Sequence, residues 1–119
     1  DSGTIFSLEG GTNPIDITLP THSPGIHFEF CINASFNASL SIESSNSSKF
    51  IGSAFIYSFN SASGVFHFPP ALTHTKILIN SLTKGWAAGG NIKIVALKDK
   101  WYILAHLLGT GTLTTPFST

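Results

Sequence analysis

The chain has 119 residues, only 10% of them charged, and its six lysines balance six acidic residues with no arginine present. Nucleic-acid readers present a basic face with forked arginine contacts, so this composition argues against nucleic acid as a partner. No apolar run approaches the about 18 residues of a membrane-spanning helix, and the length suits one domain with its own core.

Short β-prone runs bounded by Gly, Pro, Asn and Ser recur along the whole chain, and no window shows the apolar stripe of a helix. Turn residues separate these runs at roughly ten-residue spacing, which is typical of a sandwich or barrel. The sequence predicts one all-β domain over residues 1–119, an antiparallel, jelly-roll-like β-sandwich of about eight to ten short strands. The expected strands are Thr4–Leu8, Ile15–Leu19, Gly25–Ile32, Ser39–Ser44, Phe50–Phe59, Gly64–Phe68, Thr75–Leu82, Asn91–Leu97, Trp101–Leu107 and Gly111–Thr114.

Several of these runs alternate apolar and polar residues. In the third run Phe28 and Phe30 share one face, and in the fourth Leu40 and Ile42 share one face while Glu43 takes the other. A period of two places alternate side chains on a buried and a wetter face. The predicted core residues are Phe28, Phe30, Leu40, Ile42, Ile77, Ile79, Ile92, Ile94, Trp101 and Ile103.

The third run also contains Cys31, the only cysteine of the chain. A single cysteine cannot form an intrachain disulfide, so no disulfide framework is expected. Its position in an apolar strand indicates a small, inward-facing structural thiol. A reactive thiol is the alternative.

The last third of the chain predicts a β-hairpin. Two apolar, β-rich runs, Asn91–Leu97 and Trp101–Leu107, flank the short charged link Lys98-Asp99-Lys100. This arrangement is typical of a hairpin with a three- to four-residue loop. The hairpin is expected to serve packing, since it contains no catalytic motif.

Five histidines are the candidates for metal binding or catalysis. None has the spacing of a zinc motif. His27 and Glu29, two residues apart, would project from one strand face and could form a metal pair, although a solvated face explains them as well. His67 and His106 lie in apolar runs and are expected to be packed or interfacial. The five are His22, His27, His67, His74 and His106.

Other catalytic devices are missing from the sequence pattern. No Gly-x-Ser-x-Gly elbow is present, and the acidic residues Asp1, Asp16 and Asp99 fall at ends or in turns. The paired glycines lack the Lys-Ser/Thr of a phosphate loop and indicate turns. We therefore expect no catalytic residue, no cofactor and no metal.

Motifs spread over nearly the whole chain resemble small β-sandwich structural proteins of tailed bacteriophages, particularly the capsid decoration (cement) proteins of marine phages. The likeness also extends to phage tail-fibre head domains. The motifs, in chain order, are Ser2-Gly3-Thr4-Ile5-Phe6, Ile17-Thr18-Leu19-Pro20, Pro24-Gly25-Ile26-His27-Phe28-Glu29-Phe30, Ile51-Gly52-Ser53, Gly90-Asn91-Ile92-Lys93-Ile94-Val95, Lys100-Trp101-Tyr102-Ile103, Leu108-Gly109-Thr110-Gly111-Thr112 and Thr115-Pro116-Phe117.

The resemblance implies a trimeric, non-enzymatic virion protein, on the capsid surface or at a fibre tip. The short length and the Thr115-Pro116-Phe117 end favour the capsid surface, where the homotrimer would bind the major capsid protein. The near-zero net charge favours association in general terms. Apolar residues outside the core phase, such as Phe55 and Tyr57, also favour subunit contacts. The alternative is a tail-fibre or spike head domain that binds a host glycan or receptor.

The two ends of the chain, Asp1–Leu8 and Gly109–Thr119, are the expected contact with the capsid. The tail is β-prone but carries two glycines and a proline, and it ends near a large apolar residue. Such a segment can add to a neighbour's sheet edge or fold back on its own sandwich. The predicted interface residues are Phe6, Leu113, Pro116 and Phe117.

Overall fold

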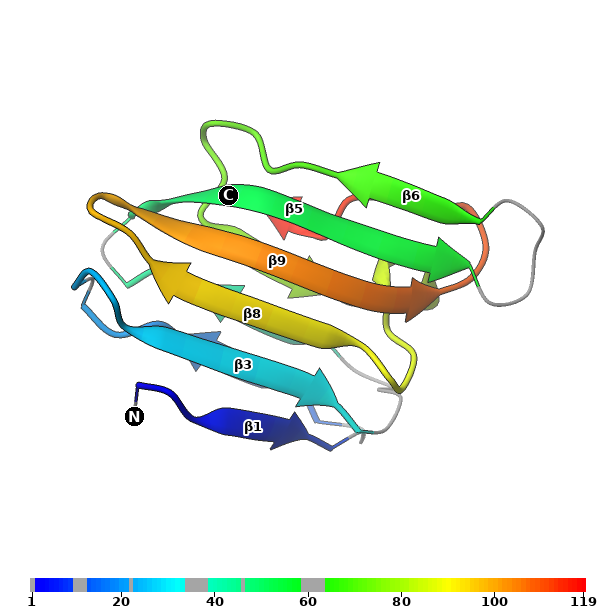
Figure 1. The fold of residues 1–119 in the computed structure, drawn as a ribbon. Helices are drawn as coiled ribbons and strands as arrows, with labels where there is room; N and C mark the ends of the chain where they lie inside the picture. Colours follow the sequence, from blue (N-terminus) through cyan, green and yellow to red (C-terminus); the bar gives the residue numbers. More distant parts are fainter. Residues whose placement is uncertain (1, 10–12, 22, 34–38, 46, 59–63) are drawn as a thin grey trace.

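The computed structural model describes residues 2–9, 13–21, 23–33, 39–45, 47–58 and 64–119. In these ranges the chain forms two packed β-sheets (Figure 1), and its one helical segment is a single 3₁₀ turn, η1 (Leu82–Lys84). The predicted all-β sandwich is therefore confirmed. The two sheets differ in width, and this difference determines which apolar side chains remain uncovered.

The wider sheet has six strands, and Figure 1 shows it face-on with β1 and β6 at its two edges. On its four interior strands alternate side chains point to the sheet interface and are buried, while the others point to solvent. In spatial order the strands are β1 (Ile5–Leu8), β3 (His27–Ile32), β8 (Asn91–Ala96), β9 (Lys100–Gly109), β5 (Lys49–Ser58) and β6 (Val65–Phe68).

The narrower sheet has four strands and lies behind the wider one in Figure 1. Its inward residues Leu40 and Ile42 are fully buried, as are Ile77 and Ile79 on the neighbouring strand. In spatial order the strands are β10 (Phe117–Ser118), β7 (Lys76–Ile79), β4 (Leu40–Glu43) and β2 (Ile15–Thr18).

Strand pairing departs from the expected antiparallel pattern, because both sheets are mixed. Strand β1 runs parallel to β3, β2 runs parallel to β4, and β5 runs parallel to β9. In each of these pairs the chain visits the opposite sheet before it returns beside its earlier strand. Such a crossover brings the second strand back in the same direction, whereas a direct hairpin reverses it.

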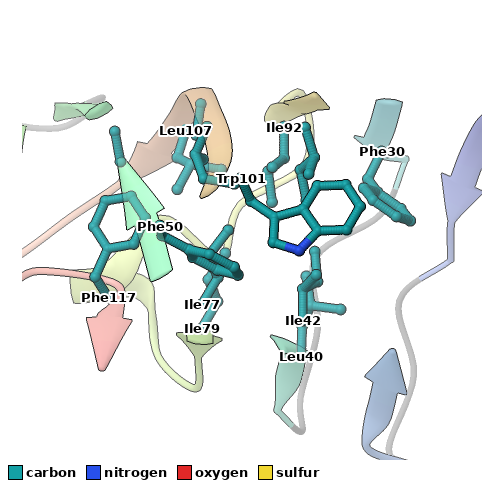
Figure 2. Close-up of a cluster of buried hydrophobic side chains, with 14 of the residues drawn as sticks. Phe30, Leu40, Ile42, Phe50, Ile77, Ile79, Ile92, Trp101, Leu107 and Phe117 are labelled. Atoms are coloured by element: carbon teal, nitrogen blue, oxygen red, sulfur yellow. The ribbon is translucent and has the colours of Figure 1, made fainter. Parts of the chain in front are cut away.

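The core lies between the two sheets, and all ten predicted core residues are buried there. Figure 2 shows the Trp101 side chain reaching from β9 toward Leu40 and Ile42 of β4. Phe50 of β5 fills the neighbouring volume, and both rings are almost completely excluded from solvent. Period-two alternation therefore identified the buried positions for all ten of the predicted residues.

The predicted hairpin is confirmed as strands β8 and β9, which pair antiparallel from Asn91↔His106 to Ala96↔Trp101. The Leu97 N–H donates to the Lys100 carbonyl at 2.8 Å and closes the loop. The run Gly111–Thr114, expected as a strand, is irregular, and the last strand is β10 further along. Gly111, which opens this segment with a positive φ of 80°, contributes to the shift, since glycine weakens a strand interior.

Truncating Phe28 or Trp101 to alanine is expected to lower the free energy of unfolding by about 3–5 kcal/mol, because each leaves a large cavity in the core. Chemical denaturation followed by fluorescence or circular dichroism measures this loss. Tyr102→Ala is the matched control, since Tyr102 neighbours Trp101 on β9 but faces solvent. Equal stability of the Phe28 and Trp101 variants and the wild type would show that the strand phase is misassigned.

Candidate interaction surfaces

The structure places three of the four predicted interface residues inside the protein's own core. Leu113 and Phe117 are 8% and 3% exposed, and Pro116 is also buried. Strand β10 pairs antiparallel with β7, with Phe117 opposite Ile77. The Leu78 N–H donates to the Pro116 carbonyl at 2.7 Å, which holds the tail in place.

The tail therefore folds back on its own sandwich, the second of the two arrangements expected for it. Phe117 lies between the sheets beside Phe50 (Figure 2), because an apolar ring gains more from this volume than from solvent. In this arrangement Leu113, Pro116 and Phe117 are not available to seat in a neighbour's pocket. Their expected role as the anchor is replaced by a structural role.

Phe6, the fourth predicted residue, lies at the molecular surface on the edge strand β1. Its ring is stacked on Phe30 with centroids 5.2 Å apart and an interplanar angle of 16°. Phe28 completes the cluster, with its centroid 6.3 Å from that of Phe6. Phe6 nevertheless remains 37% exposed. It therefore presents an aromatic surface to solvent at one edge of the wider sheet.

An apolar groove of about 350 Å³ opens beside Phe6, between the edges of the two sheets. The cluster of Phe6, Phe28 and Phe30 forms one wall, and residues of β2 and the segment after it form the other. Few polar groups reach this space, so it suits an apolar side chain better than a charged ligand. The lining residues are Phe6, Ser7, Leu8, Ile17, Thr18, Leu19, Pro20, Phe28 and Phe30.

The opposite edge of the wider sheet, strand β6, also exposes apolar side chains. Phe66 pairs with the buried Ile56 across the β5–β6 ladder, so it has the phase of a core residue. It is nevertheless 41% exposed, and Val65 beside it is more so. Its ring stacks on that of Phe68 with centroids 6.4 Å apart. The narrower sheet thus leaves an aromatic pair partly uncovered at this edge.

An aromatic row crosses the outer face of the wider sheet near β6. Phe55 of β5 lies between His67 of β6 and His106 of β9 in the strand register. Its ring stacks on His67 at 5.0 Å and meets the edge of His106 at 5.6 Å. Both histidines pack against aromatic surface, as expected for imidazoles in apolar runs, and both stay exposed.

The other half of the outer face is polar. Glu29 accepts a hydrogen bond from Asn91, whose amide also lies 3.4 Å from the Cys31 sulfur. Cys31 is therefore half-buried on the outer face, and the expectation that it points inward is wrong. The error has a simple cause: Phe28, Phe30 and Ile32 take the core phase, so the residues between them must face outward.

The proposed metal pair, His27 and Glu29, also lies on this outer face. His27 Nδ1 is 3.2 Å from the Gly25 carbonyl oxygen, and Glu29 interacts with Asn91. Within the described ranges, no group of three or more His, Cys, Asp or Glu side chains could hold a metal ion. Each of the two residues thus has a partner within the protein.

Charged side chains lie outside the two edge strands of the wider sheet, although Glu9 directly follows β1 and accepts a hydrogen bond from Ser7 Oγ at 3.1 Å. Lys100 and Asp99 form an exposed ion pair of 3.1 Å at the β8–β9 turn. The hydrogen bond from Lys100 and its positive charge lower the pKa of Asp99 below its ordinary value. By contrast, the two edge strands β1 and β6 themselves carry no lysine, arginine or carboxylate side chain.

Among the described residues, no helix has the length and apolar character needed to cross a membrane. In comparisons with known proteins, no family model, curated protein or solved structure matches this chain. Function must therefore be argued from the surfaces themselves.

Sequence analysis did not identify the β6 edge or the groove wall on β2. A signal for β6 exists, because Val65–Phe68 is a short apolar strand that stops at Pro69-Pro70. Proline is confined to strand ends and edges, so this pattern favours an edge strand. No sequence pattern predicts the groove, because its shape depends on how β2 of the narrower sheet packs against β3 of the wider sheet.

Replacing Phe117 by alanine is expected to destabilise the domain by about 3–5 kcal/mol, since its ring is buried between the sheets. Ser118→Ala is the matched control, because Ser118 follows directly on β10 and is not fully buried. Denaturant titration of both variants measures the effect. An unchanged stability of Phe117→Ala would contradict the packing of the tail on its own sandwich and would favour its addition to a neighbour's sheet edge.

Proposed function

We propose that this protein is a non-enzymatic structural component of a bacteriophage virion, a decoration protein that binds the outer capsid surface as a homotrimer. The motif resemblance given above supports the assignment to a virion, and the β-sandwich is the fold that the resemblance implies. The proposed function is binding to the major capsid protein. Self-association would place three binding surfaces on one particle, and this multivalency would strengthen the binding.

The observation that carries the proposal is the distribution of exposed apolar side chains. Of the eight exposed large apolar residues among the described ones, four lie on the two edge strands of the wider sheet, and neither strand carries a lysine or an acidic residue. These four are Ile5, Phe6, Val65 and Phe66. Exposed apolar side chains on an unpaired edge strand favour contacts with another protein chain. A protein that acts by assembly needs such surfaces, whereas a small-molecule enzyme needs convergent polar groups around a pocket.

The binding test uses capsids of the phage that encodes the chain, stripped of their surface proteins. Purified protein is expected to co-sediment with them and to saturate at a copy number that is a multiple of three. Capsids of an unrelated phage serve as the control and should retain none. Failure to bind the matching capsids at any concentration below the solubility limit would contradict the proposal.

A fibre or spike head that binds a host glycan is the second candidate, and the aromatic row favours it. Sugar rings stack on exposed aromatic faces, and the half-buried Phe55 with the exposed imidazoles of His67 and His106 forms an aromatic row on the outer sheet surface. Glycan-array binding that disappears in Phe55→Ala, with no binding to capsids, would support this candidate over decoration. The decoration account predicts no glycan binding in either protein.

A further inference from the structure

The two edges of the wider sheet match each other. Strands β1 and β6 are both four residues long, and both carry apolar side chains that the narrower sheet leaves exposed. They lie at opposite edges of one sheet (Figure 1), and no described residue pairs with the free side of either strand. An exposed, uncharged edge strand is a template for pairing with another chain.

Strand direction allows the two edges to meet. Counting through the parallel and antiparallel ladders of the wider sheet, β1 and β6 of one chain run in opposite directions. A second copy can be placed beside β1 in the same orientation as the first, so that both narrower sheets lie on the same side. The β6 strand of this second copy then runs antiparallel to β1. The wider sheet would continue from one copy into the next with its core face kept on one side.

The backbone of β1 leaves two residues with unused hydrogen-bonding groups. The carbonyl groups of Thr4 and Leu8 accept bonds from the β3 side, from Glu29 and Asn33. In a parallel ladder alternate residues direct both backbone groups to the same side, so those of Ile5 and Ser7 point to the free side.

The backbone of β6 leaves a matching pair. The Ser58 N–H donates to the Gly64 carbonyl, so the alternate residues Val65 and His67 direct their backbone groups away from β5. Pro69 ends the strand because it has no N–H to donate. Each free edge therefore offers two N–H and two C=O groups in the same spacing.

Only one antiparallel register uses all of these groups. It pairs Ile5 with His67 and Ser7 with Val65, and it places Phe6 opposite Phe66. Both phenylalanines have the core phase, since Phe6 pairs with the buried Phe30 and Phe66 with the buried Ile56. Phe66 of the second copy would then lie beside Phe6, at the mouth of the apolar groove that Phe6 lines. A cross-strand aromatic pair stabilises such a contact.

We propose that β6 of one copy adds to β1 of the next copy in this register, and that three such contacts close a ring. The contact is heterologous, because two different edges meet, and heterologous contacts either close into rings or propagate as filaments. This inference names the surfaces of the homotrimer on which the proposed function rests. A second copy is the occupant because the same chain carries both complementary, uncharged edges.

A charge placed on β6 tests the contact. Phe66→Lys is expected to convert the trimer to monomers at micromolar concentration, because pairing would bury an unpaired ammonium at the groove. The matched control is Leu97→Lys, since Leu97 is 40% exposed but lies in the β8–β9 loop, away from both edges. Light scattering measures the mass, and circular dichroism verifies the fold of both variants. A folded Phe66→Lys protein that keeps the wild-type oligomeric mass would overturn the proposal.

Disulfide cross-linking tests the register without disturbing the aromatic pair. Facing residues of such a pair have Cα atoms about 5.5 Å apart, within the range that a disulfide spans. In a Cys31→Ser background, Ile5→Cys and His67→Cys proteins are mixed and oxidised. A covalent dimer is expected only in the mixture, and Lys93→Cys mixed with Ile5→Cys should give none, since Lys93 lies on the interior strand β8.

The outcomes separate this inference from the proposed function. Dimers from His67→Cys alone would indicate β6–β6 pairing and would overturn the head-to-tail contact, as would the absence of the mixed dimer. Either result leaves the capsid-binding test unaffected. Conversely, mixed dimers from a protein that binds no capsid would support the edge contact and contradict decoration.

Discussion

The burial of alternate side chains between two sheets of unequal width governs this molecule. Trp101 and Phe50 of the six-stranded sheet pack on Leu40, Ile42, Ile77 and Ile79 of the four-stranded sheet, and the tail adds Phe117 to the same layer (Figure 2). The four-stranded sheet is too narrow to cover the whole inner face of the six-stranded sheet. Residues with the core phase therefore remain partly exposed on the outermost strands, and Phe6 and Phe66 are the clearest examples.

Exposed edges of this kind normally carry a lysine, a proline or a bulge that prevents uncontrolled pairing. In this protein the edge strands are protected from uncontrolled pairing only by being short. Each has four residues, and β6 ends at Pro69. The proposed contact of two hydrogen-bonded residue pairs and one aromatic pair is small, so one such contact would not hold two copies together firmly. Closure of the proposed ring would add stability, because the last contact would form within an assembly that already exists.

Much of the fold was predictable because it depends on local pattern. The core residues of strands β3, β4, β7, β8 and β9 followed from period-two alternation, and the β8–β9 hairpin followed from two apolar runs around Lys98–Lys100. The parallel pairs were not predictable, because they depend on which sheet the chain enters next. Cys31 was assigned to the wrong face although the alternation of its own strand places it outside.

The candidate surfaces were less predictable than the fold. Phe6 was identified from its place near the start, but Leu113, Pro116 and Phe117 were not recognised as core residues. A terminal apolar residue can seat in its own domain or in a neighbour, and sequence does not distinguish the two. Likewise, Phe66 is exposed because the narrower sheet does not extend over β6. The width of that sheet cannot be read from the sequence of β6.

Amide hydrogen exchange tests the central claim, that the free sides of β1 and β6 are covered by a second copy. The amides of Ile5, Ser7, Val65 and His67 point away from their own sheet. The account predicts that they are protected about as well as interior strand amides when the protein is concentrated. It also predicts that all four exchange rapidly after dilution to monomers or in Phe66→Lys. Rapid exchange at all four positions in a protein of trimeric mass would contradict it.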